Sequence, residues 1–267
     1  MKFGINLECA KHNYVVKRSI LLEQSISPKK PRMVNVMRKK HDFRKRMLVF
    51  SPHPDDGALG CGGTIAKRVS EGFEVYVVLL TDGRHAFTQS LGITSEPTPE
   101  EVKQIRLKEF KGAMELLGVP EKNLLFFGFE DGTLEMHKAE AEEKVINVIE
   151  KCWPADVYYP FRRDCHPDHR ATNWIVRHAL QQLRYAGSYE FTIIHTHAVL
   201  GPVMEKFLSI LKRDEVGEDV SAFVTTKKKA LDKYKSELTI ISSKQKEPLH
   251  TSVENFLKKK EVFHESK

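Results

Sequence analysis

Two short runs of the sequence bring histidine and carboxylate side chains together in a pattern that suits metal-assisted hydrolysis. His-Pro-Asp-Asp occupies residues 53–56, and His-Pro-Asp-His occupies residues 166–169. Imidazole nitrogen and carboxylate oxygen together suit zinc, and a catalytic zinc ion takes three protein ligands and keeps its fourth position for water. We therefore predict one zinc ion per subunit, with His53, Asp56 and His169 as its ligands.

The side chains that the metal does not use predict the rest of the mechanism. Zinc acidifies its bound water, and a nearby carboxylate can take the proton of that water as it attacks a carbonyl. Asp55 is the predicted general base, and His166 could protonate a leaving amine. Proline and aspartate are also common in ordinary turns. Two such runs at strand ends are harder to explain in that way, so the pattern favours a metal site.

The elements around these runs predict an α/β fold. Apolar stretches at 47–50, 73–80, 124–127 and 156–160 indicate strands, and helical periodicity follows at 58–71, 100–117, 139–152 and 170–183. This alternation implies right-handed crossovers and a mostly parallel sheet, in a Rossmann-like three-layer sandwich. Both runs follow strands, and ligands bind at the carboxyl ends of parallel strands. We therefore expect the two runs to meet at one edge of the sheet.

The two ends of the chain differ from this central part. We expect residues 1–45, which are basic and contain two prolines, to form a poorly ordered or irregular lead-in. Residues 46–267 should form a single domain with a mixed C-terminal extension. In that extension we predict strands at 189–199 and 220–224, a helix at 226–238 and a short helix at 253–260.

Composition restricts the partners and the setting. The net charge of +7 suggests nucleic acid, but the basic residues concentrate at the two ends, a pattern typical of solvated tails. The four cysteines form no CxxC pair, which argues against a disulfide framework. No stretch approaches the about 20 apolar residues of a membrane span, and we find no signal-peptide pattern. We expect a cytoplasmic protein that does not bind nucleic acid, and leave open whether it forms a homo-oligomer.

The two runs resemble the signature motifs of the PIG-L/LmbE-like family of zinc-dependent N-acetylglucosaminyl deacetylases. The resemblance covers roughly residues 46–240 and continues in the family's order through Gly62-Gly63-Thr64-Ile65, Leu80-Thr81-Asp82-Gly83, Phe129-Glu130-Asp131-Gly132 and Tyr234-Lys235-Ser236. It implies that zinc is bound by the same three residues predicted above and that Asp55 is the base. It also implies that His166 stabilises the oxyanion or protonates the departing amine.

Three further positions have a functional and a plain interpretation. Arg106 and Asp131 match positions that contact sugar hydroxyls in relatives, so the resemblance implies substrate binding. Arg106 could instead be a solvent-facing helix residue paired with Glu109, and Asp131 could be a turn former. Asp168 either orients a ligand histidine from the second shell of the metal or caps the helix that follows.

The sequence also departs from the family pattern. Gly57 replaces the acidic residue that usually follows the first motif, and we expect altered loop geometry there without loss of zinc. Glu237 stands where glutamine is common, a change that we interpret as peripheral. Some relatives complete the site with a residue from a neighbouring subunit, and His264 is our candidate for that residue.

The leading hypothesis is a zinc-dependent hydrolase that removes the acetyl group from an N-acetylglucosamine-containing small molecule or glycoconjugate. One alternative is a zinc hydrolase of another amide or ester on the same scaffold, because α/β folds host many functions. The other is a non-catalytic sugar- or nucleic-acid-binding protein that uses the basic ends. This second alternative predicts no dependence on metal.

Overall fold

The computed structural model describes residues 45–185, 187–193, 215–250 and 252–266. The chain divides into two compact units, residues 1–40 and 41–267, and every described residue belongs to the second. The predicted lead-in, apart from Lys45, therefore lies outside the described residues, as do the C-terminal residues of the strand predicted at 189–199.

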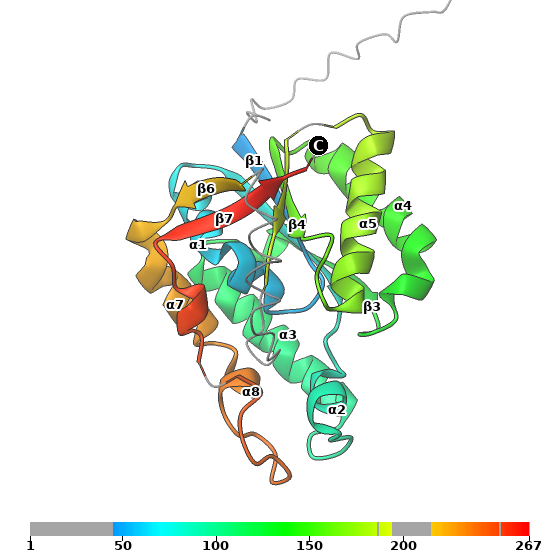
Figure 1. Cartoon of the computed structure of the whole chain (residues 1–267), viewed down its shortest axis with the longest axis vertical. Coiled ribbons are helices and arrows are strands. Elements are labelled where there is room, and N and C mark those ends of the chain that lie inside the picture. Colours follow the sequence, from blue (N-terminus) through cyan, green and yellow to red (C-terminus); the bar gives the residue numbers. More distant parts are fainter. Residues whose placement is uncertain (1–44, 186, 194–214, 251, 267) are drawn as a thin grey trace, which may run out of the picture. The chain divides into compact units, whose positions relative to one another are not determined.

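Seven strands of the described region form one mixed sheet in the order β3-β2-β1-β4-β5-β7-β6 (Figure 1). Neighbours among the first five pair in parallel, whereas β7 pairs antiparallel with both β5 and β6. These strands are β1 (Arg46–Ser51), β2 (Glu74–Thr81), β3 (Leu124–Phe129), β4 (Asp156–Pro160), β5 (Ser188–Phe191), β6 (Glu215–Asp219) and β7 (Lys260–Glu265). The predicted mostly parallel sheet with a mixed C-terminal extension is confirmed.

Helices cover both faces of this sheet, as Figure 1 shows. Alternate residues of the buried strand β1 point to opposite faces. Met47 and Val49 pack with residues of α1, α3 and α7, and Leu48 and Phe50 pack with residues of α4 and α5. The three-layer prediction is therefore confirmed. The helices are α1 (Asp56–Ser70), α2 (Ala86–Leu91), α3 (Pro99–Leu116), α4 (Lys138–Cys152), α5 (Pro167–Gln182), α7 (Val224–Leu231) and α8 (Lys235–Leu238).

The C-terminal third differs most from the sequence predictions. The strand lies at 215–219, and the predicted strand at 220–224 is instead a short 3₁₀ helix that leads into α7. The helix predicted at 226–238 breaks into α7 and α8. The helix predicted at 253–260 is a short 3₁₀ helix at Glu254–Phe256, followed by strand β7. These short segments carry weak periodicity, so pairing with distant strands decided their structure.

The C-terminal extension packs against the glycine-rich part of α1. The helix is broken at Cys61, and a Cβ added at Gly60 would lie 2.4 Å from the ring of Phe191. Beside this break the Nζ of Lys227 donates to the Leu59 carbonyl at 2.8 Å and to Glu261 at 2.7 Å. Glu261 in turn accepts from the amides of residues 63 and 64. The buried ion pair thus satisfies the backbone groups that the broken helix leaves open.

None of the helices in the described part of the chain combines the length and the apolar character that crossing a bilayer requires.

Candidate metal centre and active site

The two motif turns meet at the carboxyl edge of the sheet. The first turn follows β1 and the second follows β4, and these strands are hydrogen-bonded neighbours. The chain continues from β1 to β2 on one side, while β4 and β5 lie on the other, so the strand order reverses between them. Ligands of open α/β sheets bind at such a switch point. The sequence prediction that these turns share one edge is confirmed.

The first turn is held by hydrogen bonds to three successive carbonyls. Thr81 donates to Pro52 O through its amide at 2.9 Å and its hydroxyl at 2.8 Å. Ser51 Oγ donates to His53 O at 2.6 Å, and Tyr234 Oη donates to Pro54 O at 2.8 Å. Strand β2 and the segment between α7 and α8 therefore fix the direction of the histidine and the two aspartates.

The three predicted ligands place one atom each at the corners of a small triangle. His53 Nδ1 lies 3.0 Å from Asp56 Oδ2 and 3.2 Å from His169 Nε2, and the third side, from His169 Nε2 to Asp56 Oδ2, is 3.0 Å. A tetrahedral zinc ion with bonds of about 2.0–2.1 Å holds its ligand atoms roughly 3.3 Å apart. The donor set and its spacing therefore fit a metal ion that bridges all three residues.

Carboxylates contact the outer nitrogens of both predicted ligand histidines. His169 Nδ1 lies 3.0 Å from Asp164 Oδ2. His53 Nε2 lies 3.3 Å from Asp168 Oδ2 and 3.2 Å from Asp131 Oδ1. These contacts favour a proton on the outer nitrogen of each ring and a lone pair on the inner one, which is the tautomer that metal ligation requires.

The carboxylates also govern how the centre titrates without a metal. Burial by itself would lower the pKa of His169, but Asp56 and Asp164 raise it to about 9. Burial would raise the pKa of Asp56, yet the two histidines hold it well below its ordinary value. In the metal-free protein this cluster therefore retains protons that a metal ion must displace.

We predict that the metal-free protein loses stability at alkaline pH. The folded pKa of His169, about 9, lies above its ordinary value of 6.5. Its contribution is therefore complete below about pH 6.5 and is lost as the pH rises through 9, a change of about 3 kcal/mol. Urea unfolding of chelator-treated protein between pH 6 and 9.5 measures it. His169→Gln should reduce the fall, and an equal fall in this variant would contradict the assignment.

Asp168 and Asp131 are both more than turn residues. Asp168 is fully buried and accepts from the amides of Gly132 at 2.7 Å and Leu134 at 3.2 Å. The N-cap of α5 is His166, so the helix-capping interpretation of Asp168 is wrong. Asp131 is 3% exposed and accepts from the amide of His85 at 3.0 Å. Both carboxylates reach the outer nitrogen of His53, while contact of Asp131 with a sugar stays a prediction.

Asp55 and Arg106 form an ion pair beside the predicted metal ligands. Arg106 is 4% exposed, and its Nη2 lies 2.8 Å from Asp55 Oδ1 and 2.5 Å from Glu237 Oε1. The solvent-facing interpretation of Arg106 is therefore wrong, as is the peripheral interpretation of Glu237. Burial and the charge of Asp55 raise the pKa of Glu237 well above its ordinary value, although Arg106 opposes this.

His166 lies at the entrance of the second turn, half-buried. Its ring centroid is 4.5 Å from that of His53, and its Nδ1 accepts from the amide of Asp168 at 3.2 Å. Burial, followed by the positive charge of His53 and His169, lowers the pKa of His166 to about 4. The ring is therefore neutral at pH 7, with its proton on Nε2.

A cavity of about 470 Å³ joins these groups. Its wall includes all of the predicted catalytic, metal and substrate residues: His53, Asp55, Asp56, Arg106, Asp131, His166 and His169. Segment 86–91 and segment 247–250 line it as well. Of the predicted site residues, only Asp168 is not in the wall, because it lies behind His53.

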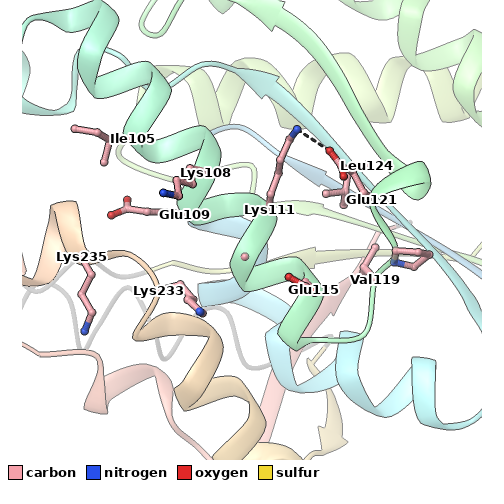
Figure 2. Close-up of a pocket in the computed structure, with 12 residues that line it drawn as sticks. Ile105, Lys108, Glu109, Lys111, Glu115, Val119, Glu121, Leu124, Lys233 and Lys235 are labelled. Atoms are coloured by element: carbon pink, nitrogen blue, oxygen red, sulfur yellow. Dashed lines mark hydrogen bonds and ion pairs between the residues drawn. The ribbon is translucent and has the colours of Figure 1, made fainter.

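A second hollow, of about 820 Å³, lies between α3 and the segment around α8 (Figure 2). Lysine and glutamate side chains of α3 and the lysines at 233 and 235 line it, and Figure 2 shows Lys111 bonded to Glu121 of the segment that follows α3. The predicted site residues are absent from its wall. The larger hollow therefore lies apart from the predicted site.

The structure also locates Gly57, which departs from the family pattern, and His264, the candidate for a neighbouring site. Gly57 lies in the first turn of α1 rather than in a loop, where its amide donates to Ser51 Oγ at 2.9 Å. A Cβ at residue 57 would lie 3.3 Å from Ser51 Oγ, so a larger residue at this position would push the Ser51 side chain aside. His264 lies on β7 with its ring 4.8 Å from that of Phe161, and its role in a neighbouring subunit stays a prediction.

Three residues that contact the site had no predicted role there: Asp164, Tyr234 and Glu237. Asp164 lies two residues before the second motif, and its acidic type so near to that motif was an available signal. Tyr234 and Glu237 come from a segment more than 60 residues further along the chain. Only the packing of that segment against α3 and the first turn reveals them.

Comparison with known proteins places this site in a family. Residues 48–180, about half of the chain, match the family model described as PIG-L, GlcNAc-PI de-N-acetylase. The chain is 35% identical to a diacetylchitobiose deacetylase of Thermococcus kodakarensis over 59% of its own length, a match that spans just over half (56%) of that relative. It is 29% identical to a probable N-acetyl-alpha-D-glucosaminyl L-malate deacetylase 2 of Bacillus cereus, over 73% of this chain and 84% of that relative.

A solved structure shows the same fold. The N,N'-diacetylchitobiose deacetylase of Pyrococcus horikoshii superposes with a TM-score of 0.59, covering 82% of this chain and 83% of that one at 22% identity. The matched residues 48–180 include strands β2, β3 and β4, most of β1, and both motif turns. This chain belongs to the PIG-L family.

Proposed function

We propose that the protein is a zinc-dependent amide hydrolase that removes the N-acetyl group from an N-acetylglucosamine-containing substrate. The observation that carries the proposal is the triangle of ligand atoms from His53, Asp56 and His169, in one cavity with the carboxylate of Asp55. The names of the relatives, which are deacetylases of N-acetylglucosamine compounds, support the choice of substrate.

The three ligand residues would hold the zinc ion. When bound, it supplies Lewis acidity towards the amide carbonyl and lowers the pKa of water. Asp164 and Asp168 keep the ligand histidines oriented through their outer nitrogens. Asp131 adds a further carboxylate at His53 and, from the cavity wall, is placed to contact a sugar hydroxyl.

Asp55 and His166 would move or hold the protons of the reaction. Asp55 takes a proton from the attacking water and passes it to the departing amine, so that the C–N bond breaks and acetate and a free amine form. Neutral His166 donates a hydrogen bond from Nε2 to the carbonyl oxygen as negative charge develops there.

The direct test joins metal analysis to product analysis. The purified protein should contain about one zinc ion per chain and release acetate from at least one member of a panel of N-acetylglucosamine conjugates. A chelator should abolish release, and added zinc should restore it. Acetate release that is insensitive to metal would contradict the mechanism. Hydrolysis of other amides or esters without acetate from any N-acetylhexosamine would favour the alternative substrate class.

A further inference from the structure

The guanidinium of Arg106 forms its hydrogen bonds with other groups of the protein. Nη2 donates to Asp55 Oδ1 and Glu237 Oε1, at 2.8 and 2.5 Å, and Nη1 donates to the carbonyl of Gly83 at 3.0 Å. The side chains of Arg106, Asp55 and Glu237 are each 5% exposed. Gly83 has φ +65°, and a Cβ there would lie 2.7 Å from Arg106 Nη1, so this close approach requires glycine.

Glu237 is itself fixed from two sides. Its neighbour Ser236 donates to the carboxylate of Glu109 through its amide at 2.7 Å and its hydroxyl at 2.6 Å. Glu109 lies three residues after Arg106 on α3. On the other side, the amide of His250 donates to the Glu237 carbonyl at 2.8 Å. The backbone of Glu237 is therefore tied to the helix that carries Arg106 and to the segment that lines the cavity.

A flexible arginine needs this second carboxylate to hold a fixed direction. The Arg106 side chain reaches from α3 across to the first motif turn, where both carboxylates accept from Nη2. Nε is already a buried donor without an acceptor among the described residues, and loss of one carboxylate would leave a second. With Glu237 and the Gly83 carbonyl in place, the guanidinium has acceptors on both of its terminal nitrogens. Asp55 then meets a cation whose position does not depend on Asp55 itself.

We propose that Glu237 is a positioning residue for the catalytic base: it holds Arg106, and Arg106 holds the carboxylate of Asp55 in the direction of the metal centre. The inference rests on the proposed function. Glu237 and Arg106 should therefore affect the rate of the chemical step, because a displacement of a reacting group by about 1 Å can lower that rate about 10²-fold.

The kinetic test compares two variants at position 237. Glu237→Leu removes the acceptor and should lower kcat for acetate release by about 100-fold while KM changes less than about threefold. Glu237→Gln keeps an oxygen that can accept from Arg106 and should retain kcat within about fivefold. Glu115→Leu removes an exposed carboxylate from α3 and should match the wild type. Equal losses in the Leu and Gln variants, or a change in KM alone, would overturn the inference.

An unfolding experiment tests the same coupling without substrate. The effects of Asp55→Asn and Glu237→Leu on the midpoint of thermal unfolding should be non-additive by about 2 °C, because both act on Arg106. In an Arg106→Leu background the non-additivity should change, because only the direct repulsion between the two neighbouring carboxylates remains there. Additive effects in the wild-type background would overturn the coupling, whatever the activity. Absence of acetate release with a non-additive cycle would reject the proposed function alone.

Discussion

Replacing Asp55 with asparagine should abolish acetate release while the metal stays bound. The substitution keeps the size of the side chain and an oxygen that can accept from Arg106, so the 2.8 Å contact can persist. It removes the basic carboxylate that takes the proton from water. Loss of a general base costs typically about 10²–10⁴-fold, and we expect kcat to fall at least about 10³-fold.

The measurement pairs kcat with zinc content for the wild type and the variant. Zinc per chain should be unchanged, because Asp55 is not a corner of the ligand triangle. Asp232→Asn serves as a control for the carboxylate–amide exchange, since the Asp232 side chain is 42% exposed and is not in the cavity wall. An Asp55→Asn variant that retains zinc and substantial activity would show that Asp55 is not the base.

Replacing His169 with alanine should remove both zinc and activity. The variant deletes one of three ligand atoms and leaves Asp164 buried without its histidine. Two remaining protein ligands do not make a zinc site of the kind found in hydrolases. Zinc per chain should fall to near zero after dialysis, and acetate release should fall to the level of the chelated wild type.

Asp164→Asn should weaken zinc binding less than His169→Ala does. It leaves all three ligand atoms in place but removes the carboxylate that lies 3.0 Å from His169 Nδ1. Loss of such an outer partner typically weakens metal binding by about 10–100-fold. Competition with a zinc chelator measures the affinity of both proteins. An affinity equal to that of the wild type would show that Asp164 does not orient His169.

The sequence by itself determined the first four strands of the sheet and that the predicted metal ligands lie together at its edge. Strands and helices between residues 46 and 183 follow strong local patterns, and their alternation allows essentially one handedness of crossover. Because both motifs follow strands of that sheet, the meeting of His53 with His169 could be predicted although 115 residues separate them in the chain. The His-Pro-Asp sequence occurs at the ends of two strands of one sheet, and this repetition favoured a metal site over ordinary turns.

Only the tertiary structure decided how the base is held. The sequence could not show that Arg106 turns inward, because a charged residue on an amphipathic helix is usually solvated. Its burial depends on Gly83 and Glu237, which approach from β2 and from the C-terminal segment. That segment has short elements with weak periodicity, so its strands and helices were predicted poorly. Long-range contacts, and not local pattern, place the residues that orient Asp55.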